Sequence, residues 1–124
     1  MSKKDTPETR ITKAVRSVLK TCGVFHWKQW QGPMSQPKGV SDLLGIRTVT
    51  ITPEMVGMKV GIFTAIEMKQ PGWKPPRPGT RAYDHYGNQK RFIDKIIRAG
   101  GVGFFAQSID EVIDGLELRD RFLF

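Results

Sequence analysis

The segment that most constrains the fold is residues 7–22, where apolar side chains recur at helical spacing. Thr6 offers a hydroxyl for the N-cap, Pro7 suits the first helical position, and Gly23 ends the pattern. The apolar positions share one stripe, made of Ile11, Ala14, Val15, Val18, Leu19 and Cys22. Because a helix with one apolar stripe has to bury it, we expect this helix to cover a β-sheet.

The rest of the chain alternates between strand-like and helix-like patterns. Strands are expected at residues 24–30, 40–46, 48–52, 60–69 and 102–106. Helices are expected at residues 88–99 and 108–116, with a single helical turn at 53–56. This alternation of helices and strands predicts an α/β fold, in which a small mixed sheet is flanked by helices in one domain spanning residues 1–124.

Two stretches rich in proline and glycine interrupt these patterns. Residues 31–39 are expected to form a loop, and residues 70–87 a longer one. Long loops in small domains commonly have a function, and the second loop carries cations beside the aromatic residues Trp73, Tyr83 and Tyr86. We therefore expect residues 70–87 to contact the substrate. The aromatic rings either stack on unpaired bases or anchor the loop against the core.

Charge and cysteine content narrow the possible partners and the cellular compartment. Lys and Arg total 20 against 12 Asp and Glu, a formal net charge of +8, which indicates attraction to a polyanion such as nucleic acid. The chain has a single cysteine, Cys22, so it cannot form an internal disulfide. Together with His26 and His85, this cysteine gives too few ligands for a four-ligand zinc site of Cys and His. No apolar run approaches the ~20 residues of a membrane span. We expect a cytoplasmic protein that is neither exported nor inserted into a membrane.

Carboxylates at two places form the candidate catalytic pattern. Asp42 ends the motif Gly-Val-Ser-Asp at residues 39–42, and Glu67-Met68-Lys69 follows further along the chain. Alternation along a strand places Glu67 and Lys69 on one face and Met68 on the opposite, apolar face. If residues 40–42 pair with the end of this strand, the Asp42 and Glu67 carboxylates and the Met68 carbonyl can bind one Mg²⁺ or Mn²⁺ ion.

Such a site suits phosphodiester hydrolysis. The metal polarises the phosphate and lowers the pKa of a bound water, while the Lys69 ammonium orients that water or stabilises developing charge. The simpler interpretation is that Asp42 follows a turn and that Glu67 and Lys69 protect an exposed strand edge.

Two further polar residues occur on faces that the patterns predict to be buried. Glu8 lies three residues before Ile11, so it either points inward to a partner or complements the dipole of its helix. Gln89 precedes Phe92 and Ile93 at helical spacing, and its amide either bonds a water or phosphate near the metal or is satisfied at the edge of the core.

Basic residues surround these positions in the sequence. They can neutralise phosphates on both sides of a scissile bond or simply form a solvated surface: Lys38, Lys74, Arg77, Arg81, Lys90 and Arg91. The apolar C-terminus, residues 122–124, either closes the core or packs against a second subunit.

These motifs, in this order, resemble the VRR-NUC domains of the PD-(D/E)xK nuclease superfamily, especially small standalone phage and bacterial members. The resemblance spans most of the chain and rests on Pro7-Glu8, residues 38–45, residues 65–69, Gln89 and residues 100–102. It implies a restriction-endonuclease-like fold, with Asp42, Glu67 and the Met68 carbonyl as metal ligands and Lys69 as the catalytic lysine. Glu8 and Gln89 fall where the family has supporting residues.

The resemblance also implies a homodimer that cuts branched DNA, such as a Holliday junction or a flap. The chain departs from the family pattern at Ser41, where proline often stands, and at residues 105–108, Phe-Ala-Gln-Ser, which replace the arginines of the family name. A non-catalytic DNA-binding accessory module with the same fold is the main alternative. A sequence-specific nuclease is disfavoured, because the chain shows no separate recognition element.

Overall fold

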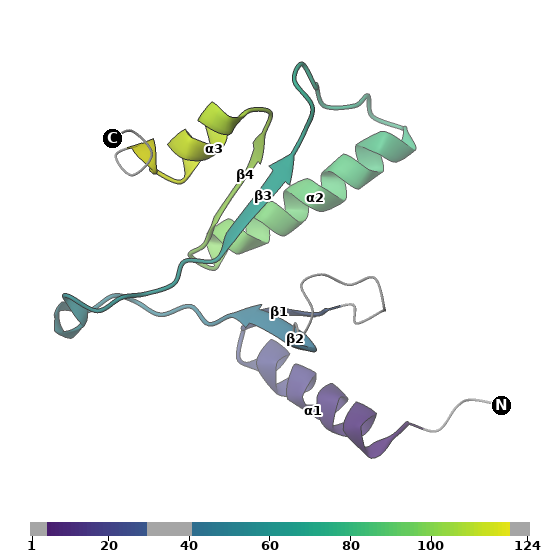
Figure 1. Ribbon diagram of the computed structural model, residues 1–124. Coiled ribbons are helices and arrows are strands. Elements are labelled where there is room, and N and C mark those ends of the chain that lie inside the picture. Colours follow the sequence, from purple (N-terminus) through teal and green to yellow (C-terminus); the bar gives the residue numbers. More distant parts are fainter. Residues whose placement is uncertain (1–4, 30–40, 120–124) are drawn as a thin grey trace. The chain divides into compact units, whose positions relative to one another are not determined.

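Helices and strands alternate along the chain, as Figure 1 shows. The elements are α1 (Pro7–Thr21), β1 (Phe25–Lys28), β2 (Leu43–Ile46), the 3-10 turn η1 (Pro53–Met55), β3 (Thr64–Met68), α2 (Arg81–Arg98), β4 (Val102–Ala106) and α3 (Ile109–Gly115). The computed structural model describes residues 5–29 and 41–119. Contacts divide the chain into an N-terminal unit, residues 1–50, and a C-terminal unit, residues 51–124. The architecture is mixed α/β, as expected.

The N-terminal unit consists of α1 and an antiparallel strand pair. The Thr6 hydroxyl accepts a hydrogen bond from the Thr9 N–H at 3.1 Å, which confirms the predicted N-cap of α1. β1 and β2 pair in a register that places Phe25 opposite Ile46. The Gln29 N–H donates to the Asp42 carbonyl at 2.8 Å, so backbone pairing continues to the residue before β2.

The apolar stripe of α1 is not buried as predicted. Ile11, Val15 and Val18 are 65%, 42% and 61% exposed, and only Leu19 on this stripe is half-buried. Glu8 is likewise exposed rather than turned into a core. The physical reason is size: a helix of 15 residues is about 22 Å long, whereas strands of 4 residues extend only about 13 Å. A two-stranded sheet this short cannot cover the whole stripe.

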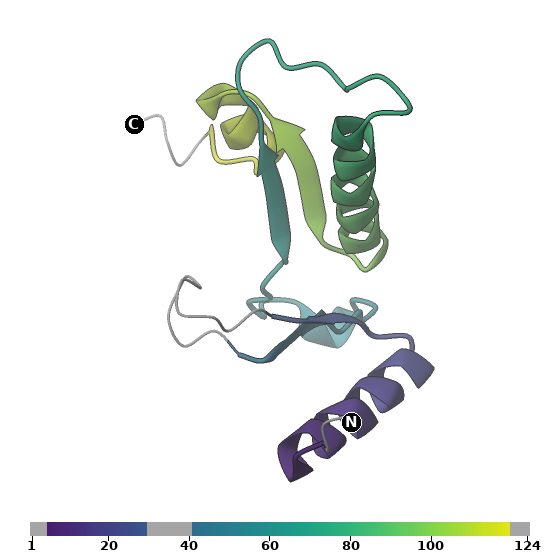
Figure 2. The same cartoon turned by 90° about the vertical axis from the view of Figure 1, so that its right-hand side faces the viewer.

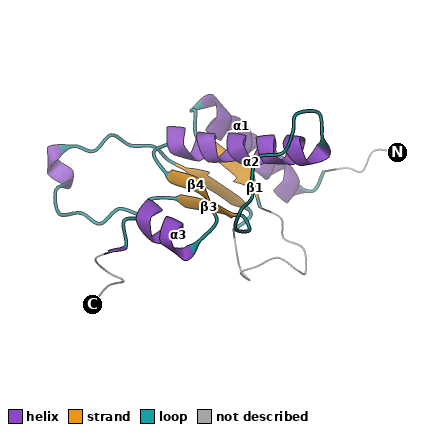
Figure 3. Cartoon of the chain, turned by 90° about the horizontal axis from the view of Figure 1, so that it is seen from above, coloured by secondary structure: helices purple, strands orange, loops and turns teal. Residues whose placement is uncertain are grey.

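The C-terminal unit is built on the parallel pair β3 and β4. Thr64 lies opposite Val102, and the register continues to Met68 opposite Ala106. α2 connects the two strands and covers one face of the pair, while α3 covers the other, which is clearest in Figures 2 and 3. The strand β4 and the 53–55 turn lie where the sequence predicts them.

Glycines in and before β4 let α2 approach the sheet closely. A Cβ atom at Gly101 would lie 2.7 Å from Ile96 Cγ2, and one at Gly103 would lie 2.9 Å from Ile93 Cγ2. Ile96 is fully buried and Ile93 nearly so, and with Ala106 and Ile113 they form the core of the described residues. Because these glycines have no side chain, the α2 helix can pack close to the backbone of β4.

The predicted loop over residues 70–87 is wrong in its second half, because α2 begins at Arg81 rather than near residue 88. The Thr80 hydroxyl accepts from the Tyr83 N–H at 3.1 Å and caps the helix. Tyr86 packs against Trp73 and Phe105, with ring centroids 5.5 and 5.4 Å away. This packing offsets the helix-weakening glycine that suggested a loop.

The expected single mixed sheet consists, in the described residues, of two separate two-stranded sheets. Residues 48–52 form no strand, and β3 begins at Thr64 instead of residue 60. Strand propensity produces a strand only beside a pairing edge, and neither segment lies in a β-ladder of the described chain. The expectations for residues 31–39 and 122–124 lie outside the described residues. None of the described helices combines the length and apolar character needed to cross a bilayer.

Candidate active site

Three of the predicted site residues meet at the carboxyl end of β3. Glu67 lies in the strand, Lys69 follows it, and Gln89 lies on α2. The Gln89 Nε2 group donates to Glu67 Oε1 at 2.7 Å, and Lys69 Nζ donates to Gln89 Oε1 at 3.0 Å. Lys69 Nζ lies 3.9 Å from Glu67 Oε1. The prediction that Glu67 and Lys69 share one face of the strand is confirmed.

The amide of Gln89 matches both charged neighbours. Its NH₂ group can only donate and faces the Glu67 carboxylate, while its oxygen can only accept and faces the Lys69 ammonium. One neutral side chain thus links a carboxylate and an ammonium that are otherwise at the outer limit of an ion pair. This arrangement holds both charged groups in defined positions without merging them into a close salt bridge.

Glu67 and Met68 direct oxygen atoms away from these contacts. Among the described residues no donor contacts Glu67 Oε2, and the Glu67 side chain is 36% exposed. The Lys69 N–H donates to the Ala106 carbonyl at 2.8 Å, so the Met68 carbonyl of the same trans peptide points away from β4. A carboxylate and a carbonyl oxygen are the hard ligands that Mg²⁺ and Mn²⁺ prefer, so the donor set fits such an ion.

The Met68 side chain differs from its predicted place on an apolar face, because it is 55% exposed. α3 is short, and its Gly115 lies against the Phe104 ring of β4 rather than over the end of β3. The predicted role of Met68 depends on its backbone carbonyl and is unaffected.

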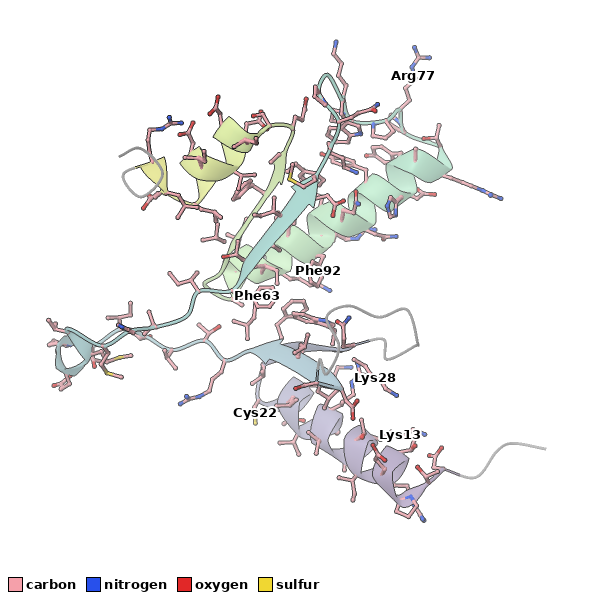
Figure 4. The ribbon with its side chains drawn as sticks, viewed as in Figure 1. Lys13, Cys22, Lys28, Phe63, Arg77 and Phe92 are labelled. Atoms are coloured by element: carbon pink, nitrogen blue, oxygen red, sulfur yellow. The ribbon has the colours of Figure 1, made fainter. Side chains whose placement is uncertain are left out.

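An open groove of about 490 Å³ runs between β3 and α2 beside this cluster. Its polar end is formed by Glu67, Asn88 and Gln89, and its apolar part includes Phe63 and Phe92, which are labelled in Figure 4. The groove thus offers space for a substrate directly against the Glu67 carboxylate.

Aromatic rings that the sequence did not assign to the site surround Lys69. The ammonium lies 5.1 Å from the centroid of the Trp73 ring and 5.9 Å from that of Phe105. These rings stack on each other with centroids 5.8 Å apart, and the Lys69 side chain is only 16% exposed. The available sequence signal was the Pro-Gly turn after Lys69, which returns Trp73 toward the strand end.

Asp42 and Glu8 belong to the N-terminal unit. Asp42 is exposed directly before β2, and Glu8 is exposed in the first turn of α1, where it complements the helix dipole. Among the described residues no three His, Cys, Asp or Glu side chains form a group that could hold a metal. Of the predicted site residues, Glu67, Lys69 and Gln89 are the three whose side chains contact one another in the described part of the chain.

The predicted DNA-contacting cations are exposed wherever the structure describes them. Arg77 extends outward from the connection between β3 and α2, as Figure 4 shows, and Arg91 donates to the Asn88 side chain. Lys74, Arg81 and Lys90 are also exposed. Lys38 lies outside the described residues.

The chain was compared with protein-family models, curated proteins and solved structures. No family model, curated protein or solved structure matches the chain. The geometry of the site and the chemistry of its side chains are therefore the basis for assigning a function.

Proposed function

We propose that this protein is a Mg²⁺- or Mn²⁺-dependent endonuclease that hydrolyses phosphodiester bonds in branched DNA, with the PD-(D/E)xK fold of a VRR-NUC domain. The observation that carries the proposal is the chain of hydrogen bonds from Glu67 through Gln89 to Lys69 at the end of β3. It combines a carboxylate with an open oxygen, an ammonium and a neutral linker beside a groove.

Each residue of this cluster has a distinct role. Glu67 Oε2 and the Met68 carbonyl hold the metal, which when bound polarises the phosphate and makes its water more acidic. The Lys69 ammonium donates a hydrogen bond to the attacking water or to a phosphate oxygen and stabilises the negative charge that develops there. Gln89 keeps the carboxylate and the ammonium separate, so that each remains available for its own task.

Asp42 completes the proposed ligand set. In this proposal the Asp42 carboxylate would supply a second oxygen ligand of the kind that Mg²⁺ and Mn²⁺ prefer. Glu8 then supports the site or the waters of a second ion.

The net charge of +8 supports DNA as the substrate. Phosphates on both sides of the scissile bond contact Lys38, Lys74, Arg77, Arg81, Lys90 and Arg91 in this proposal. The enzyme acts as a homodimer, because a twofold axis suits symmetric cleavage of two strands. Its proposed location is the cytoplasm of a bacterial or phage-infected cell.

The test is cleavage of a labelled four-way junction, a flap and a linear duplex by wild type and Glu67→Gln, each in Mg²⁺, Mn²⁺ or EDTA. We expect metal-dependent cutting of the branched substrates, lost in Glu67→Gln. Glu117→Gln is the matched control, because Glu117 is exposed beyond α3 and contacts no residue of the cluster.

Two results would contradict the proposal. Equal cleavage by Glu67→Gln and wild type would remove Glu67 from the mechanism. Tight DNA binding in EDTA, with no product in any ion, would favour the accessory-module alternative, since binding depends mainly on the basic surface.

A further inference from the structure

We infer that Trp73 is a positioning residue for Lys69, and that Gln107 holds Trp73 in place. The inference rests on the proposed function only for its kinetic consequence, since the position of the ammonium can be measured without any cleavage. Trp73 belongs to the connection after β3, and Gln107 follows β4.

The Trp73 indole limits where the Lys69 side chain can go. Its ring centroid lies 5.1 Å from Lys69 Nζ, within the range of a cation-π contact. The same ammonium also donates a hydrogen bond to Gln89 Oε1 at 3.0 Å. A long, flexible lysine side chain is thereby held between an aromatic face and a single acceptor, which reduces its freedom to leave the Glu67 carboxylate.

The backbone around Trp73 is fastened to the strand β4 through one side chain. Gln107 Oε1 accepts from the Gly72 N–H at 2.9 Å, and Gln107 Nε2 donates to the Trp73 carbonyl at 3.0 Å. Gly72 has φ +83°, a conformation that other residues rarely adopt, and the Trp73 N–H donates to the Gln70 carbonyl at 3.1 Å. These contacts close a tight turn that returns the indole to the end of β3.

A ring in this position does not serve as a platform for nucleotide bases. Trp73 is half-buried, stacks on Phe105 with an interplanar angle of 8° and packs against Tyr86 at an angle of 54°. Because these rings and the Lys69 ammonium already contact the indole, its removal should affect the rate of the chemical step more than the affinity for DNA.

The experiment compares Trp73→Leu, Trp73→Phe and Gln107→Leu with wild type. The first readout is the NMR shift of the Lys69 ε-protons, which the indole ring current displaces in the wild type. We expect this displacement to fall most in Trp73→Leu, where only the Phe105 ring remains near the ammonium, to fall less in Gln107→Leu and to be largely retained in Trp73→Phe. Val56→Ala is the control, because Val56 is 86% exposed at the end of the η1 turn.

The second readout is single-turnover cleavage together with the Kd for junction DNA. We expect Trp73→Leu to lower the cleavage rate about tenfold with an unchanged Kd, and Trp73→Phe to restore most of the rate. Trp73→Leu combined with Gln107→Leu should lose little more than Trp73→Leu alone, because both act on the same group. Gln107→Leu keeps every ring and remains informative if Trp73→Leu does not fold.

Unchanged Lys69 resonances in folded Trp73→Leu would overturn the inference. So would a raised Kd with an unchanged rate, because that pattern identifies Trp73 as a DNA contact. If the wild type cleaves no DNA, the proposed function fails, and the Lys69 proton shift alone still decides whether Trp73 positions the ammonium.

Discussion

Gln89 shows how a single neutral side chain can organise two charges. Its spacing before Phe92 and Ile93 predicted that it faces inward, and the structure confirms that it is half-buried. Which groups it contacts could not be predicted, because Glu67 and Lys69 lie 22 and 20 residues earlier in the chain. Only the packing of α2 against β3 brings the amide between them.

Gln89→Leu tests this linkage. The substitution keeps the side-chain size but leaves Glu67 and Lys69 without their shared partner, so we expect cleavage to fall at least tenfold. The free energy of unfolding should fall by about 2 kcal/mol, because two hydrogen bonds with a usual net value of about 1 kcal/mol each are lost. Single-turnover assays and urea unfolding measure the two effects. Gln70→Leu is the control, because Gln70 is exposed in the same unit and accepts a hydrogen bond from the Trp73 N–H through its backbone carbonyl.

At the scale of the elements, α2 differs most from its sequence-based prediction. Prolines and glycines before residue 88 suggested a loop, yet the helix begins at Arg81 and includes Gly87. A helix-interior glycine costs about 1 kcal/mol relative to alanine, and the aromatic packing of Tyr86 on Trp73 and Phe105 offsets that cost. Local propensity gave the wrong boundary because tertiary contacts stabilise the first turns.

Alanine substitutions at two glycines should therefore have opposite effects on stability. At Gly87 a Cβ atom would lie 3.3 Å from the Arg91 guanidinium, the flexible end of an exposed side chain, so Gly87→Ala should stabilise by about 0.5–1 kcal/mol. At Gly103 it would lie 2.9 Å from Ile93 Cγ2 in the core, so Gly103→Ala should destabilise by about 1–3 kcal/mol. Urea denaturation of both variants checks the prediction. A stabilised Gly103→Ala would show that α2 does not pack closely on β4.

At the scale of the whole molecule, the proposed function requires one domain made from both units. In the variant Trp73→Phe, the urea transition is reported by Trp27 and Trp30 of the N-terminal unit. In the variant that combines Trp27→Phe with Trp30→Phe, it is reported by Trp73 of the C-terminal unit. The two transitions should then coincide. Tryptophan fluorescence measures each unit separately in this design. Two well-separated midpoints would show that the units unfold independently and would contradict the prediction of one cooperative domain.

The basic surface makes a second prediction at this scale. Lys74→Ala with Arg77→Ala should lower the slope of log Kd against log salt concentration by about 2, roughly one unit for each lost phosphate contact. Affinity should weaken by a similar factor for junction and duplex DNA, because both carry the same charged phosphate backbone. Fluorescence anisotropy across a salt series measures both. Arg10→Ala with Lys20→Ala, on the exposed surface of α1, should leave the slope unchanged.

The sequence by itself determined the features that depend on local periodicity. The start of α1, the strand Val102–Ala106 and the shared face of Glu67 and Lys69 follow from capping chemistry and from the alternation of side chains along a strand. Tertiary structure alone decided that Gln89 bridges Glu67 and Lys69, and that Trp73, held by Gln107, covers Lys69. The physical reason is that backbone sterics act between near neighbours in the chain, whereas these contacts join residues that only the packing of α2 and β4 around β3 brings together.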